Sequence, residues 1–280
     1  MDITTTGYGL HWDEFTYAIS NTPSSQLLLW AGTIPSLAGN AGWQRVTGIA
    51  DLAQTLFSST RSGLNNAVTA FQEDRLSDHC LQTAKDFSDA CGEQITALGN
   101  LLQAATERPT QILPELFFAG LGFYVGGGGV DGNGGIPDLD ITLLGIGAHR
   151  SPITHSIIVG IGLETLCLAS LSLFTMVYHN LPEQHQPFWD SLHEQLQSYG
   201  NMFLLGGSAG IAYHLAVDAI IQPAPLHDLP FEMPIEAHQT VLATNAVAEA
   251  NAAVEFKKRR RNKTPTATLL EGKVVGAEKT

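Results

Sequence analysis

The chain has 280 residues and a formal net charge of −13, and charged residues make up only 15% of it, against about 25% in typical soluble domains. This negative net charge indicates that the chain as a whole is not a nucleic-acid binder, because phosphate contacts need lysine and arginine. The 3 cysteines form no CxxC pair, so neither a disulfide framework nor a thiolate zinc site is expected.

Residues 1–110 are expected to form a mostly helical N-terminal region that is soluble or lies at an interface. The opening MDITTTGYGLHWDEF has no basic start and no apolar core, so no secretory signal is expected. The apolar stretch 26–39 is interrupted by Gly32 and Pro35 and is shorter than the roughly 20 residues of a membrane span. Helical apolar spacing follows from about 47 to 106. We expect an amphipathic bundle or a domain that binds a protein partner.

Residues 111–222 are expected to form a membrane-embedded helical domain. Two long apolar runs, 153–178 and 202–221, contain one formal charge each, Glu164 and Asp218. Both runs approach or exceed the roughly 20 residues that cross a bilayer, and their small residues let helices pack closely in lipid. The alternative is that these runs are buried helices of a soluble protein.

The remaining segments complete an all-α architecture, a membrane-embedded helical bundle with an N-terminal helical region. Residues 112–130 are apolar and glycine-rich, which favours a membrane-inserted helix that does not cross fully. Residues 223–262 begin with a proline-broken loop and contain a helix from about 235 to 260 that ends in a basic run. Residues 263–280 lack aromatic side chains and are expected to be a disordered tail.

The charges beside the apolar runs predict which side of the membrane each end faces. The connection 179–201 contains no lysine or arginine, whereas 257–261 reads KKRRR. Because basic flanks stay in the cytoplasm, we expect 179–201 to be a loop facing outward and the C-terminus to be cytoplasmic. The start of the first run and the end of the second then meet on the cytoplasmic side. The basic run is expected to bind anionic membrane lipids, while nucleic acid is not an expected partner and oligomers are left open.

Two pairs of side chains on that side have metal-ligand chemistry. His214 and Asp218 are four residues apart on a helix and therefore share one face. An imidazole and a carboxylate presented together suit a divalent metal, although a buried His–Asp hydrogen bond between helices is an equal alternative. His149 and His155 flank a turn that leads into the first apolar run, where they have no evident packing role.

The motif PDLD places Asp138 and Asp140 after a glycine-rich segment. These carboxylates could complete a metal shell or act as a general base, although aspartates near turns also serve as caps. Arg150 is expected to stabilise an anionic group of the substrate. Glu164 lies on the helix face opposite His155, so we expect it to pair with a neighbouring helix. The predicted ligands of a divalent ion, zinc first and manganese or iron as alternatives, are Asp138, Asp140, His149, His155, His214 and Asp218.

The order PD-x-D, then HR…THS before an apolar helix, then H-x-x-x-D in a later helix resembles the YdjM-type membrane-bound metal-dependent hydrolases of bacteria. The resemblance covers roughly residues 112–222 and implies an inner-membrane helical protein with a metal-dependent hydrolase centre. The matching positions are Asp138, Asp140, His149, Arg150, Thr154 to Ser156, His214 and Asp218. HRSPITHS departs from the family's HRG-x-THS by one extra residue between the histidines, with Ser151-Pro152 in place of the glycine.

These observations lead to three hypotheses. The first is a hydrolase at the cytoplasmic face of the bacterial inner membrane that acts on a phosphoester or lipid-type substrate. The second is a non-enzymatic membrane scaffold with a structural metal site, whose residues 1–110 recruit a partner. The third is a small transporter in which Glu164 and Asp218 line the polar pathway.

Overall fold

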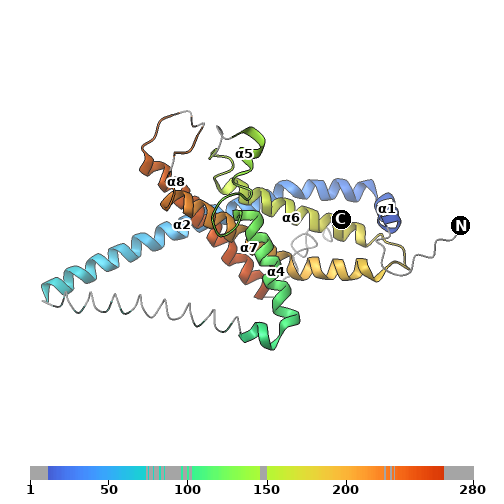
Figure 1. The fold of residues 1–280 in the computed structure, drawn as a ribbon, viewed down its shortest axis with the longest axis horizontal. Helices are drawn as coiled ribbons and strands as arrows, with labels where there is room; N and C mark the ends of the chain where they lie inside the picture. Colours follow the sequence, from blue (N-terminus) through green and yellow to red (C-terminus); the bar gives the residue numbers. More distant parts are fainter. Residues whose placement is uncertain are drawn as a thin grey trace, which may run out of the picture. The chain divides into compact units, whose positions relative to one another are not determined.

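A computed structural model describes residues 12–73, 103–145, 150–223, 225–227, 229 and 231–261, together with positions 75, 78, 82, 85, 96 and 100. These residues form helices and no strand, which confirms the all-α class (Figure 1). The helices are α1 (Trp12–Asn21), α2 (Ser24–Gln72), α4 (Pro109–Gly127), α5 (Leu139–Leu144), α6 (Ile157–Tyr178), α7 (Pro187–Ile220) and α8 (Ile235–Arg261).

The chain divides into two compact units. The first contains residues 1–46 and 118–280, and the second contains residues 47–117. The second unit holds the C-terminal part of α2 and the start of α4. Every side chain discussed below belongs to the first unit.

The core of the first unit is built around α7. Ile211 and Leu215 of α7 are fully buried and pack with Leu163 of α6 and Leu242 of α8. In a second cluster, Leu204 of α7 packs with Leu37 of α2, Leu168 of α6, and Ala252 and Phe256 of α8. Full burial stabilises each large apolar side chain by about 1.5–3 kcal/mol. α8, predicted over about 235–260, is therefore confirmed as a helix that covers α7.

Glycines allow α4 and α7 to cross with their backbones in contact. Gly122 and Gly126 of α4 repeat at a spacing of four, as do Gly206 and Gly210 of α7. A Cβ atom at any of these positions would collide with a backbone carbonyl oxygen of the opposite helix. Small residues at this spacing are typical of helices that pack in membranes.

Two described helices, α6 and α7, are long and apolar enough to cross a membrane. They differ in how the protein covers them, because 33% of the most apolar window of α6 is buried, against 67% for α7. Packing within the protein accounts for much of the hydrophobicity of α7. Much of the apolar surface of α6 is not covered by the protein.

The predicted loop over 179–201 is wrong for most of its length, because α7 begins at Pro187. Proline suits the first turn of a helix, where its missing N–H has no intrahelical partner. Trp189 is buried, stacks on Phe15 of α1 at 5.1 Å between ring centroids, and donates a hydrogen bond to Glu14. These contacts stabilise a polar helical segment that has no apolar run to reveal it.

Gly32 and Pro35 lie inside α2, which continues through both residues. An interior proline costs a helix about 3 kcal/mol. Neighbouring contacts offset this cost, because Leu37 is buried in the core and Trp30 Nε1 donates to the Ala169 carbonyl oxygen at 2.9 Å. Tertiary packing thus overrides the local signal.

Candidate metal centre

A glycine-rich loop between α4 and α5 places Asp138 beside the end of α7. The loop is fixed to the helices by two hydrogen bonds, from Ile136 N to Val125 O at 3.0 Å and from the Tyr213 hydroxyl to Val130 O at 2.5 Å. Gly134 N donates to Asp138 Oδ2 at 2.5 Å, and Gly134 adopts a φ of 88°, which favours glycine. The other carboxylate oxygen, Asp138 Oδ1, faces the two histidines.

His155 is completely buried just before the start of α6. Thr154 Oγ1 lies 3.0 Å from its Nδ1 and donates to Asp140 Oδ2 at 2.7 Å. Asp140 Oδ2 also accepts from Ser151 N and lies 3.5 Å from His155 Nδ1. Burial raises the pKa of Asp140, but the hydrogen bonds from Ser151 and Thr154 outweigh burial and hold it below its ordinary value. Asp140 and Thr154 thus face Nδ1 and leave Nε2 directed elsewhere.

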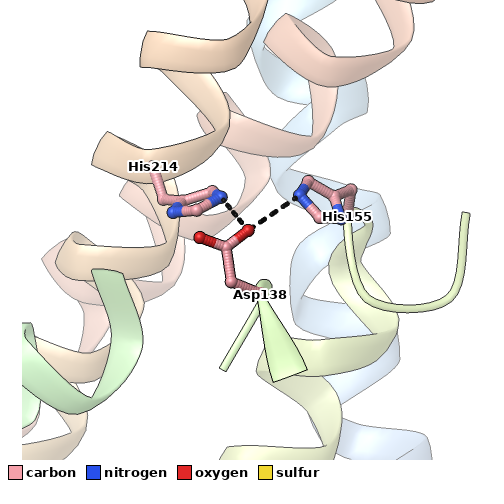
Figure 2. A group of neighbouring side chains, drawn as sticks. All are labelled: Asp138, His155 and His214. Carbon is pink, nitrogen blue, oxygen red and sulfur yellow. Dashed lines mark ion pairs between the residues drawn. The ribbon is translucent and has the colours of Figure 1, made fainter. Parts of the chain in front are cut away.

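Carboxylate oxygens of Asp138 and Asp218 lie close to ring nitrogens of His155 and His214. His155 Nε2 lies 3.3 Å from Asp218 Oδ2 and 3.8 Å from Asp138 Oδ1. His214 Nε2 lies 3.5 Å from Asp218 Oδ2 and 3.6 Å from Asp138 Oδ1. Figure 2 shows the Asp138 carboxylate pointing between the two imidazole rings. The predicted convergence of PDLD, THS and H-x-x-x-D is therefore present.

These separations are longer than those of good hydrogen bonds and would also fit ligands of a shared metal ion. Good N–H···O bonds have donor–acceptor distances of about 2.7–3.2 Å, so the contacts are too long for that purpose. Zinc bonds of about 2.0–2.1 Å in a tetrahedron place neighbouring ligand atoms about 3.3 Å apart. The buried His214 Nε2 and Asp218 Oδ2 have no hydrogen-bond partner, which a bound cation would supply. Asp138, His155 and His214 could hold a metal ion, since their ligand atoms lie within 4.8 Å of one another.

Arg150 lies behind Asp218 and is buried. Its Nη2 donates to Asp218 Oδ1 at 2.9 Å, and its Nη1 donates to the Gln222 carbonyl oxygen at 2.9 Å. Its φ of 66° lies in the left-handed region, which costs a non-glycine residue about 1–3 kcal/mol. The structure therefore directs Arg150 to Asp218 and leaves Asp218 Oδ2 facing the histidines. His149, the remaining predicted ligand, lies outside the described residues.

A second buried polar cluster joins α2, α6 and α8. Arg45 binds both carboxylate oxygens of Glu249, at 2.5 and 3.0 Å, and Glu164 Oε2 at 2.7 Å. All three side chains are buried. Burial raises the pKa of Glu249, against the opposing effect of Arg45. The prediction that Glu164 pairs with a neighbouring helix is confirmed. Neither Arg45 nor Glu249 was predicted from the sequence, although a lone charge within an alanine-rich stretch, as at Glu249, is a usable signal.

Comparison with known proteins supplies no relative from which a role could be transferred. No protein family, no curated protein and no solved structure matches the chain. The resemblance to YdjM-type hydrolases therefore stays a prediction.

Proposed function

We propose that this chain is a metal-dependent hydrolase whose divalent ion binds between the start of α6 and the end of α7. The observation that carries the proposal is the spacing of four ligand atoms, 3.3–3.8 Å from nitrogen to oxygen, around the buried His214 Nε2 and Asp218 Oδ2. The nitrogen and oxygen donors suit zinc, with manganese or iron as alternatives.

Each side chain of the site has a distinct role in this proposal. The ion would be held by Asp138, His155, His214 and Asp218. A divalent ion supplies Lewis acidity and lowers the pKa of water that it binds. Thr154 and Asp140 fix the orientation of the His155 ring, as carboxylates commonly do behind a ligating histidine. Arg150 fixes Asp218. Asp138 is the most exposed ligand, so substrate would reach the site from its side. A phosphoester, including that of a lipid, is the proposed substrate class, because its charge matches a divalent cation.

Attachment to a membrane, proposed to be the bacterial inner membrane, is part of the proposal and is supported by α6. Ile158 and Leu166 of this helix are 54% and 67% exposed, which is costly in water. The cytoplasmic orientation follows from the basic run at 257–261. Arg259 Nη1 lies 3.5 Å from Glu164 Oε1, so the end of α8 lies beside the middle of α6. Any hydrocarbon contact of α6 must therefore lie on the side away from α8.

Metal content and turnover test the proposal together. We would purify the parent in mild detergent beside a His214→Ala/Asp218→Ala variant and a His227→Ala control, an exposed histidine outside the site. We expect near-stoichiometric metal in the parent and the control, none in the double variant, and phosphoester hydrolysis that follows the metal. Metal retained in the double variant would refute the ligand assignment. The membrane fraction of a cell lysate, washed with carbonate, tests attachment separately.

A structural metal site is the second candidate, favoured by the burial of both histidines. The side chains of His155 and His214 are 0% and 1% exposed, and closed sites with four protein ligands are typically structural. This candidate predicts that removal of the metal unfolds the first unit and that no phosphoester is hydrolysed by the metal-loaded protein.

A further inference from the structure

Helix α8 is hydrogen-bonded to two points close to the proposed ligands, at the start of α6 and near the end of α7. Gln239 Nε2 donates to the carbonyl oxygen of Ala219, the residue after Asp218. Asn245 Oδ1 accepts from Ile157 N at 2.9 Å, two residues after His155. Helix α8 contributes no proposed ligand, but it contacts the backbone next to Asp218 and close to His155.

Asn245 caps the start of α6 although it belongs to a different helix, α8. The first four N–H groups of a helix have no intrahelical acceptor. Ser156 Oγ accepts from Ile158 N at 3.3 Å, and Asn245 serves Ile157 N. Asn245 Nδ2 donates to Val241 O at 2.7 Å within α8, which fixes the orientation of its amide. The start of α6 is therefore anchored to a rigid helix beside His155.

The spacing between α6 and α8 is set one turn further along. The Glu249 carboxylate occupies the space that a Cβ atom at Gly160 would need. Arg45 holds that carboxylate in place through both of its oxygens. Because contact at Gly160 fixes the separation of the two helices, the amide of Asn245 meets Ile157 N without adjustment.

We propose that Asn245 is a positioning residue of the metal centre, which sets the place of His155 Nε2 through the start of α6. This inference rests on the proposed function. Asn245 contacts no ligand atom, and its effect on the metal passes through the backbone of α6. The side chain of the neighbouring Thr244 donates to Thr240 O in its own helix.

The test is metal affinity, measured by competition with a chelating dye, in full-length protein whose helicity is checked by circular dichroism. Asn245→Leu removes the acceptor at similar size, and we expect a 10- to 100-fold loss of affinity, the usual effect of removing a supporting contact. Asn245→Asp keeps an acceptor at a helix N-terminus and should bind nearly as the parent does. Thr244→Ala is the matched control and should bind unchanged.

A second variant breaks the same bond from the other side. Ile157→Pro removes the N–H at the first helical position, where proline is tolerated, and Ser156 already has the extended backbone that proline requires. It should lose affinity as Asn245→Leu does, and it keeps the test open if that variant does not fold. Unchanged metal affinity in either folded variant would overturn the positioning role of Asn245 and leave the metal centre in place. A loss of affinity in Asn245→Asp equal to that in Asn245→Leu would do the same. A parent that binds no metal overturns the metal centre and this inference with it.

Discussion

Among the described residues of the first unit, two clusters of buried ionisable side chains differ in the distances between their charged atoms. In the cluster of Arg45, Glu164 and Glu249, each guanidinium nitrogen meets a carboxylate at 2.5–3.0 Å. Around His155 and His214, the nitrogen–oxygen distances are 3.3–3.8 Å. The first distances are those of charge-assisted hydrogen bonds, and the second are close to the separations of atoms that share one cation. The proposed metal centre thus differs from the ion-pair network in these separations and in its imidazole nitrogens, because a guanidinium has no lone pair to offer a metal.

The largest expected effect is at Arg45. Arg45→Met leaves the buried Glu249 without a cation and Glu164 with Arg259 alone, at 3.5 Å, and loss of one partner of a buried pair costs about 3–5 kcal/mol. Denaturant unfolding monitored by circular dichroism measures this change. The triple variant Arg45→Met/Glu164→Gln/Glu249→Gln removes the uncompensated charge and should recover much of the stability. A single variant as stable as the parent would show that the cluster is not an ion-pair network.

Chelation should separate the two clusters. If metal binds the histidines, a free-metal concentration 100 times the dissociation constant stabilises the folded chain by about 2.7 kcal/mol. A chelator should remove that stabilisation from the parent and from Glu164→Gln, but change nothing in His214→Ala. Equal chelator effects in the parent and in His214→Ala would place the metal elsewhere.

A methyl group added to α6 tests how tightly the ion-pair cluster is packed. Gly160→Ala would push its Cβ into the Glu249 carboxylate, and overpacking of this kind costs about 1–3 kcal/mol. Gly162→Ala lies in the same helix with nothing within 4 Å of its Cβ, so it should gain up to about 1 kcal/mol of helix propensity. Thermal unfolding of the pair should therefore shift in opposite directions. A shift in the same direction would mean that α8 can move away.

The smallest effect is expected at an exposed ion pair outside both clusters. The hydrogen bond of His185 Nε2 to Asp190 Oδ1, at 2.8 Å, raises the pKa of His185 above its ordinary 6.5. A raised histidine pKa adds stability that is full below about 6.5 and is lost as pH rises through the higher value. The difference in melting temperature between the parent and His185→Gln should therefore be larger at about pH 5.5 than at about pH 8.5. The same difference at both pH values would show that the pair contributes nothing.

Local sequence was sufficient for the features that depend on neighbouring residues. The spacing of His214 and Asp218 placed both on one face of a helix, and the apolar runs predicted α4, α6 and most of the buried half of α7. The first turns of α7 were missed, because polar residues fold there only against Phe15 and Glu14 of α1. This segment lacks a continuous apolar run, although Trp189, Leu192 and Leu196 recur at the three- and four-residue spacing of a helix with one apolar face.

The sequence by itself determined an all-α chain and the set of residues with ligand chemistry, because helix period and residue type are local properties. Tertiary structure decided which atoms of these residues face one another. It turned Asp140 to the far nitrogen of His155, directed Arg150 to Asp218, and joined Arg45 to Glu249 across 204 positions. Such contacts depend on the summed packing of four helices, where a shift of about 1 Å separates a hydrogen bond from a shared ion, and no spacing in one dimension encodes that distance.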